Sequence, residues 1–212
     1  MSLLATDEMG IGNTTTASAV ASVLLGCEPE AITGRGAGLS DEGLVRKKAA
    51  ISPRVVYISP LIRARRTAEI LFPETRLVEV ENLKEMCFGV FQGRNYIEME
   101  KDPDYIAWVG EDCTDRCPGG ETKAEFTQRT CEAFCSLLEG ALAAGEEELV
   151  ILAHGGTQMA LMEQYGLPKK DYYSWCGPNG GGYLVTTDAE RWHKEHTLEY
   201  QCTVCYERGG QA

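Results

Sequence analysis

The stretch LVILAHGGT, residues 149–157, decides the expected fold of this chain. Its first five residues are apolar and typical of a buried strand, and His154 follows at the carboxyl end of that strand. In an α/β domain this end of the sheet carries the ligand-binding residues. Gly155 and Gly156 allow a sharp turn with close approach of a ligand, and a helix starting near Thr157 would favour an anion at its amino terminus. The alternative is a core histidine, satisfied by hydrogen bonds, before an ordinary turn.

Length and composition indicate a globular protein with its own core. The chain has 212 residues, of which 43% are hydrophobic and 25% charged, and this suits one α/β domain. Its net charge of −12 argues against nucleic acid or an anionic membrane as partner, because both favour a basic surface. A small phosphorylated substrate stays compatible, since it needs only a local cationic pocket. The oligomeric state is not set by the sequence, and a dimer stays open.

Cysteine usage indicates the compartment. The nine cysteines are an odd number, and we find neither a signal peptide nor a membrane-spanning run. We therefore expect reduced thiols in a cytoplasmic protein.

The first 25 residues predict a strand, a glycine-rich loop and a helix. LLAT (residues 3–6) is a short apolar run, and residues 17–25 are rich in alanine, which favours a helix. The loop between them contains Gly12, Asn13 and Thr14. Backbone N–H groups and a helix amino terminus can bind phosphate at such a loop. An ordinary turn capped by Asn13 or Thr14 explains the pattern about as well.

Further apolar runs complete a three-layer α/β sandwich, with a mostly parallel sheet and helices on both faces. A helix should begin near Pro60, and a longer one after PGGE (118–121) should end at Gly145. Residues 94–116 look irregular, like a lid. Residues 1–50 are too short for an independent domain. We expect them either to pack as the first strand–helix unit of one structural domain with residues 51–212 or to remain poorly anchored. The expected strands are LLAT (3–6), VVYIS (55–59), LVEV (77–80), LVILA (149–153) and GYLVTT (182–187), with a further edge strand at the carboxyl terminus.

Two kinds of side chain suggest phosphate chemistry. Arginine is shaped for bidentate phosphate binding, and Arg63 lies just after the strand at residues 55–59. We interpret the neighbouring Arg65 and Arg66 as solvated surface residues. Glu85 lies between apolar residues and a turn, where a carboxyl group can have a raised pKa and act as a general acid. The alternative for Glu85 is a solvated loop carboxylate.

The carboxyl-terminal region contains a possible zinc-binding pattern. HxxH followed by CxxC could bind zinc tetrahedrally, but the stretch HKEHTLEYQCTVC also alternates like an edge strand, which would point the two histidines to opposite faces. We therefore expect no metal and no cofactor. The pairs Cys113/Cys117 and Cys131/Cys135 are interpreted as incidental. The residues of the zinc pattern are His193, His196, Cys202 and Cys205.

The strings LLATDEMGIGNTTTASAV and ITGRGAGLSDEGLVRKK, within residues 3–50, resemble part of nicotinate-nucleotide–dimethylbenzimidazole phosphoribosyltransferase. That family makes α-ribazole 5′-phosphate for cobalamin. The resemblance implies that Gly12, Asn13, Thr14 and the turn at residues 34–36 belong to a nucleotide and phosphate site. Asp7 stands where the family usually has glycine. The chain lacks the rest of that longer enzyme, including its carboxylate base, so we do not expect transferase chemistry.

Five later strings, SPLIRARRTAEIL, NLKEMCFGVFQG, PGGETKAEF, VILAHGG and WCGPNGGGYLV, resemble the histidine phosphatase, or phosphoglycerate-mutase-like, clan. The resemblance spans about residues 52–205 and is closest to α-ribazole phosphatases. It implies that Arg63 binds phosphate, that Glu85 protonates the leaving alcohol, and that His154, next to Gly155, stabilises the transferring phosphoryl group. Such roles fit phosphoryl transfer, which depends on positioning and charge stabilisation.

The nucleophile of that clan is absent. It is a histidine in an Arg-His-Gly motif that ends the first strand, and this chain has only His154, His193 and His196, none of them in such a motif. Without it no phosphohistidine intermediate forms at that position. Asp7 and Glu8 follow the first strand about where the histidine would lie, and a carboxylate, Asp7 first, is one hypothesis for a substitute nucleophile.

Three functions stay open from the sequence. The first is an α-ribazole 5′-phosphate phosphatase of cobalamin synthesis, impaired by the missing histidine. The second is a catalytically silent protein that binds a phosphorylated ligand, or a recombined gene product. The third is a relative of the phosphoribosyltransferase.

Overall fold

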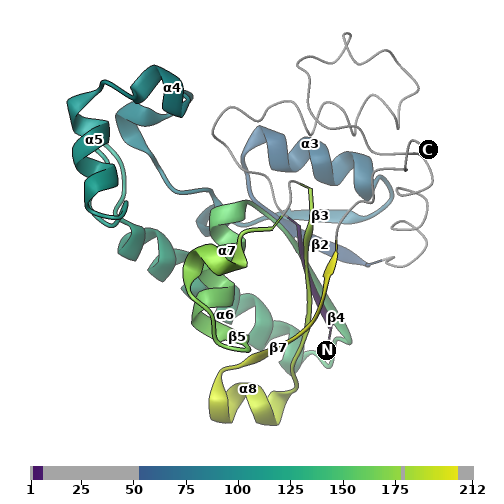
Figure 1. The fold of residues 1–212 in the computed structure, drawn as a ribbon. Coiled ribbons are helices and arrows are strands. Elements are labelled where there is room, and N and C mark those ends of the chain that lie inside the picture. The colour runs from purple at the N-terminus through teal and green to yellow at the C-terminus, as the bar shows by residue number, and fades with distance from the viewer. Residues whose placement is uncertain (1, 7–52, 178–179, 205–212) are drawn as a thin grey trace, which may run out of the picture.

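The computed structural model describes residues 2–6, 53–177 and 180–204, which form a seven-stranded sheet in the order β3-β2-β4-β1-β6-β7-β5 (Figure 1). Strands β3, β2, β4 and β1 run parallel to one another. Strand β6 is antiparallel to both of its neighbours, and β5 is parallel to β7. The bounds are β1 Ser2–Thr6, β2 Val55–Ile58, β3 Arg76–Glu79, β4 Glu148–Leu152, β5 Gly166–Leu167, β6 Gly182–Thr186 and β7 Leu198–Val204.

The helices begin and end where local signals place them. Helix α6 starts with a capping box, in which Thr122 and Glu125 satisfy each other's backbone N–H groups, and Gly145, with φ +69°, follows its last turn. The α-helices are α3 Ile62–Leu71, α4 Tyr96–Met99, α5 Pro103–Gly110, α6 Lys123–Ala143, α7 Gly155–Tyr165 and α8 Ala189–Glu195, and the 3-10 helices are η2 Glu81–Leu83, η3 Gly89–Phe91 and η4 Tyr172–Trp175.

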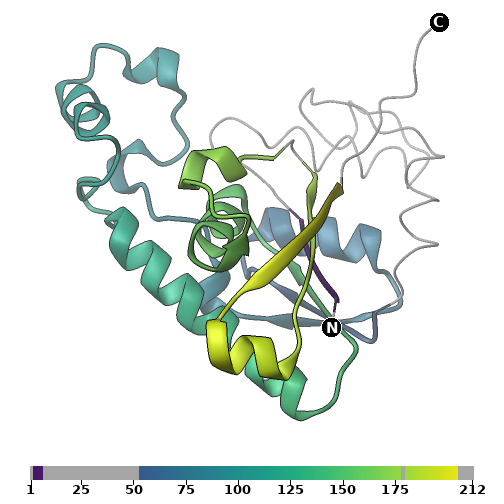
Figure 2. The same cartoon turned by 60° about the horizontal axis from the view of Figure 1, so that its bottom comes forward.

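Strand β4 shows why the sheet is covered on both faces. Val150 and Leu152 belong to a buried cluster with residues of β2 and α3. Leu149 and Ile151, which point to the opposite face, belong to a second buried cluster with residues of α6 and α7. Figure 2 shows α3 separated from α6 and α7 by the strands. The prediction of a three-layer sandwich with a mostly parallel sheet is confirmed.

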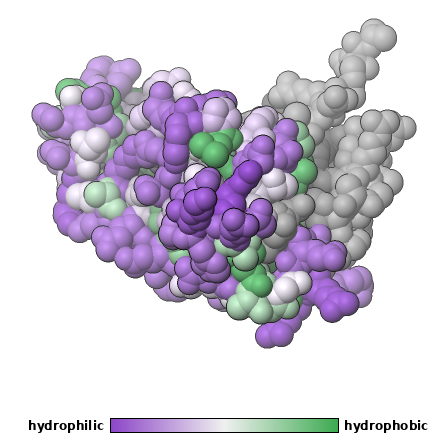
Figure 3. Space-filling model, turned by 90° about the horizontal axis from the view of Figure 1, so that it is seen from below, coloured by the Kyte–Doolittle hydropathy of each residue, from purple (hydrophilic) through white to green (hydrophobic). Residues whose placement is uncertain are grey.

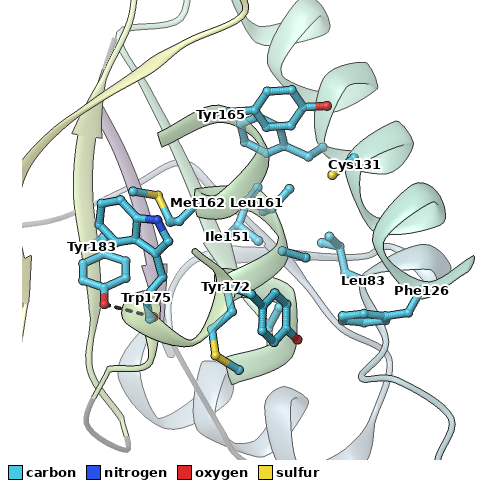
Figure 4. Close-up of a cluster of buried hydrophobic side chains, with 14 of the residues drawn as sticks. Leu83, Phe126, Cys131, Ile151, Leu161, Met162, Tyr165, Tyr172, Trp175 and Tyr183 are labelled. Atoms are coloured by element: carbon cyan, nitrogen blue, oxygen red, sulfur yellow. Dashed lines mark hydrogen bonds between the residues drawn. The ribbon is translucent and has the colours of Figure 1, made fainter. Parts of the chain in front are cut away.

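The larger core cluster fills the space between the sheet and helices α6, α7 and η4 (Figure 4). The Tyr183 hydroxyl of this cluster donates to the carbonyl of Trp175 over 3.0 Å, whereas the buried indole N–H groups of Trp175 and Trp192 have no hydrogen-bond partner among the described residues. Phe134 stacks on Tyr165 with ring centroids 5.6 Å apart, and Trp192 packs edge-on against both. This rigid layer supports α7, whose amino terminus lies at the candidate site.

The expectation of an irregular segment at residues 94–116 is wrong in part. The segment contains α4, started by a capping box of Asn95 and Glu98, and α5, capped by Asp102. Both helices are short, so caps rather than apolar periodicity determine them. Figures 1 and 2 both show α4 and α5 projecting away from the sheet.

The carboxyl-terminal strand is present, but it is not at the edge. Strand β7 lies between β6 and the two-residue strand β5, which the sequence did not predict. His193 is in helix α8 rather than in a strand, and His196 ends that helix with a left-handed φ of +51°. Within the described residues no group of three or more histidine, cysteine, aspartate or glutamate side chains could hold a metal ion. Cys205 lies outside the described residues.

Two surface observations concern the described part of the chain. None of its helices is both long and apolar enough to cross a membrane. In Figure 3 the coloured surface of the face seen from below is mostly hydrophilic, with small separate hydrophobic patches. The seven cysteines at 87, 113, 117, 131, 135, 176 and 202 are free.

Candidate functional site

The site lies where β2 and β4 end side by side. Ile58 pairs with Leu152 in the parallel ladder, so Ser59 and His154 leave the sheet at the same edge. His154 is fully buried, and its Nε2 lies 2.7 Å from the Ser59 hydroxyl. That hydroxyl oxygen also accepts from the Leu61 N–H over 3.3 Å. The contact between Ser59 and Nε2 holds the imidazole in one orientation.

The amino terminus of α7 begins immediately after His154. Gly156 N–H donates to Glu85 Oε2 over 3.3 Å, and a Cβ atom at Gly156 would lie 2.2 Å from Glu85 Oε1. Glycine is thus needed here because the carboxyl group fills the space. Thr157, also buried, has a hydroxyl without a hydrogen-bond partner among the described residues. The dipole of the helix favours an anion at this end.

Glu85 is buried, with 9% of its surface exposed. Desolvation raises its pKa above the ordinary value, and the opposing effects come from the Met86 and Gly156 N–H groups and from the charges of Arg63 and Arg129. The Met86 N–H donates to Oε1 over 3.0 Å. A carboxyl group whose neutral form is favoured can donate a proton, as a general acid must.

Arg129 of α6 fixes the loop that carries Glu85. Its Nε and Nη2 bind the carboxylate of Glu121 at 2.7 and 2.8 Å. Its Nη1 donates to the carbonyls of Asn82 and Lys84, both at 2.9 Å, and Nη2 to that of Glu85 at 3.1 Å. Arg129 also holds the pKa of Glu121 below its usual value. Sequence signals did not indicate Arg129, because the carbonyl groups that it binds lie more than forty positions away in the sequence.

Arg63 lies in the first turn of α3, close enough for its charge to lower the pKa of Glu85. Its Nε and Nη2 atoms are buried and have no hydrogen-bond partner among the described residues. Buried donors are normally satisfied, so this guanidinium group is available to a bound anion. Arg65 and Arg66 are exposed, and Arg65 pairs with Glu79, as expected of surface arginines.

The other two histidines lie at the opposite end of the sheet. Strand β6 is antiparallel to β1, and its last residue, Thr186, pairs with Ser2 at the start of β1. Helix α8, with His193 and His196 at its end, follows that point, and Figure 1 shows it on the far side of the sheet from α3. The chain has only three histidines, so His154 has no second histidine beside it.

The structure thus brings four predicted site residues, Arg63, Glu85, His154 and Gly155, to one end of the sheet. The predicted loop residues Gly12, Asn13 and Thr14, the hypothetical nucleophile Asp7 and the helix at residues 17–25 lie outside the described residues.

Residues 41–198 match the histidine phosphatase superfamily, branch 1. A protein of Hydrogenobacter thermophilus named, provisionally, phosphoserine phosphatase 2 is 32% identical over 160 residues, which cover 73% of this chain and 74% of that protein. The chain therefore belongs to the histidine phosphatase superfamily.

Solved structures share the fold. An α-ribazole phosphatase from Shigella flexneri superposes with a TM-score of 0.63 at 18% identity, covering all of both chains. A phosphoglycerate mutase from Thermus thermophilus superposes with a TM-score of 0.59 at 21% identity, covering 98% of this chain and 100% of that one.

The amino-terminal part has a second set of relatives. Residues 1–68 match a phosphoribosyltransferase family. Nicotinate-nucleotide–dimethylbenzimidazole phosphoribosyltransferases of Thermus thermophilus and Alkaliphilus metalliredigens are 50% and 53% identical over 58 and 60 residues. These matches cover 27% and 28% of this chain but only 17% of each enzyme. The resemblance of this segment to the transferase is thus confirmed over a small share of that enzyme.

Proposed function

We propose that this protein binds a small phosphate monoester at the end of β2 and β4 and hydrolyses it slowly. The observation that carries the proposal is the guanidinium group of Arg63, whose buried Nε and Nη2 have no hydrogen-bond partner among the described residues. Two such donors match two phosphoryl oxygens. The amino terminus of α7 supplies further N–H groups at the same end of the sheet.

The roles of the site residues follow from their chemistry. Arg63 would hold the phosphoryl oxygens, and His154 would stabilise the charge that develops on them. Glu85, whose pKa is raised by burial, would protonate the leaving alcohol oxygen as its bond to phosphorus breaks. The described site contains no clear nucleophile, because no second histidine lies beside His154. We therefore expect slow turnover, either by direct attack of water or through a substitute carboxylate such as Asp7.

α-Ribazole 5′-phosphate is the substrate that we propose. Structural neighbours are named α-ribazole phosphatase, and relatives of the amino-terminal segment are named for dimethylbenzimidazole, the base of that nucleotide. Phosphoserine is the competing substrate, because a 32% identical relative carries that name. A silent protein that binds phosphorylated ligands without turnover is the second candidate. A transferase-related function is favoured only by the amino-terminal segment.

The test is turnover of α-ribazole 5′-phosphate and of O-phosphoserine, measured as phosphate release, together with binding by calorimetry. Arg63→Ala should weaken binding at least about tenfold, because a charge-assisted bidentate contact is lost. Arg66→Ala is the matched control, since Arg66 is an exposed arginine on the same helix.

Each outcome supports or contradicts one of the candidate functions. Turnover above that of His154→Ala supports a phosphatase, and loss of that turnover in Asp7→Ala identifies the attacking group. Binding that depends on Arg63 without any turnover supports the silent protein. Binding that is equally strong in Arg63→Ala contradicts the proposed site.

A further inference from the structure

A hollow opens directly beside Glu85. Its volume is about 550 Å³, within the range of roughly 300–1,000 Å³ that small-molecule sites occupy. Because Glu85 is both a lining residue and the proposed acid, this hollow is where the alcohol part of a bound ester would lie. Its lining includes Lys84, Glu85, Met86, Cys87, Val90 and Gln92.

The hollow has an apolar wall held in place by backbone hydrogen bonds. Met86 and Val90 contribute side chains, and Val90 leaves 53% of its surface exposed. The Val90 N–H donates to the carbonyl of Pro118 over 2.9 Å. Cys87 and Glu121 form two hydrogen bonds. The Cys87 N–H donates to Glu121 Oε2 over 2.8 Å, and the Cys87 carbonyl accepts from the Glu121 N–H over 2.9 Å. The wall is thus preorganised for a ligand with an apolar surface.

Among the described residues that line the hollow, none offers an unpaired cation to a ligand carboxylate. Lys84 is the one lysine or arginine among the lining residues, and its ammonium group is paired with Glu81. Arg129, behind the same loop, is paired with Glu121. A carboxylate placed here would have to lose water without gaining a cationic partner, so its binding would be disfavoured.

We propose that this hollow accepts an uncharged, ring-bearing alcohol portion of a phosphate monoester and discriminates against a carboxylate-bearing one. The inference rests on the proposed function, because it takes the phosphoryl group to be held by Arg63 and the end of α7. The hollow would therefore bind nucleoside-like phosphate esters more tightly than phosphate esters of hydroxy acids and of serine.

The test compares two probes of the same shape, phenyl phosphate and 4-carboxyphenyl phosphate, by calorimetry with the full chain. We expect the carboxylated ester to bind about tenfold or more weakly. Gln92→Lys adds a cation at the rim of the hollow and should narrow that ratio. Gln201→Lys, at an exposed glutamine of β7 outside the hollow, should leave the ratio unchanged.

Thiol labelling locates the ring. Cys87 and Cys202 are both exposed, and of the two only Cys87 lines the hollow. Saturating phenyl phosphate should slow alkylation of Cys87 by iodoacetamide several-fold, as followed by peptide mass spectrometry, and leave Cys202 unaffected. Unchanged labelling of Cys87 at saturation would place the ring elsewhere and overturn the inference.

Failure of the inference and failure of the proposed function give different results. Equal affinity for the two esters, or a ratio that Gln92→Lys does not move, overturns the inference while the phosphate site stands. Absence of binding by inorganic phosphate and by both esters overturns the proposed function itself.

Discussion

Arg129→Ala should destabilise the protein more than removal of any exposed arginine. The substitution removes five hydrogen bonds, two to the Glu121 carboxylate and three to carbonyls of the loop before Met86. The two charged side chains are only 21% and 22% exposed. Breaking a buried pair by removing one partner costs about 3–5 kcal/mol. Because both side chains are still partly exposed to water, we expect the free energy of unfolding to fall by about 3 kcal/mol, the lower end of that range.

The assay is thermal unfolding followed by circular dichroism, with urea unfolding at one temperature as a check. For a chain of this size each kcal/mol lowers Tm by about 2–4 °C, so Arg129→Ala should melt about 6–12 °C below the parent protein. The Tm of Arg129→Lys should lie between those of Arg129→Ala and the parent protein, because one ammonium group cannot make all the hydrogen bonds of a planar guanidinium group.

Arg116→Ala is the matched control. Arg116 also pairs with a carboxylate, that of Glu125, but its side chain is 55% exposed, and we expect only a small change in Tm. The reasoning is refuted if Arg129→Ala melts within about 2 °C of the parent protein. It is also refuted if Arg129→Ala and Glu121→Ala show purely additive effects in a double-mutant cycle, because residues in contact should couple.

Two further predictions concern the Glu85 carboxyl group. Burial raises its pKa above 4.5, so its contribution to stability is fully present below that pH and is lost as pH rises through the raised value. Glu85→Gln should therefore gain stability relative to the parent protein across that rise, as urea midpoints at successive pH values would show; a difference that does not vary with pH would contradict this. Gly156→Ala would place a methyl group 2.2 Å from Glu85 Oε1 and should displace the carboxyl group, giving a loss of about 1–3 kcal/mol by overpacking and weaker phosphate binding. Gly140→Ala is the control in urea unfolding and calorimetry, because an added methyl group would meet no described atom within 4 Å there. Stability and phosphate affinity of Gly156→Ala equal to those of the parent protein would contradict this prediction.

Local sequence signals were sufficient for most strands. The expected strand at residues 77–80 is observed at Arg76–Glu79, and that at 149–153 is observed at Glu148–Leu152. The run of β4 is apolar on both faces because helices cover the sheet there on both sides, and such a run is easily recognised. Strand β3 lies at the edge of the sheet, and its Arg76 and Glu79 are exposed. Helices α4 and α5 were missed because their short lengths carry little periodicity.

Features that depend on distant residues were not predictable. The position of β7 inside the sheet depends on β5, a strand of two residues. The part played by Arg129 depends on carbonyls of residues 82–85. Conversely, Arg63, Glu85 and His154 could be proposed early because each follows a strand or turn whose position the sequence indicates, although their chemical roles remain predictions.

Strand β1 has a consequence for how this chain could have arisen. It lies between β4 and β6 and is the one strand that joins β3-β2-β4 to β6-β7-β5. Its residues fall within the segment that matches the phosphoribosyltransferase family. Strands pair through backbone N–H and C=O groups, which every sequence provides. A segment that resembles a different enzyme family can therefore supply the strand that joins the two halves of the sheet. The sheet therefore depends on the backbone pairing of β1 with β4 and β6 and not on which enzyme family the sequence of β1 resembles.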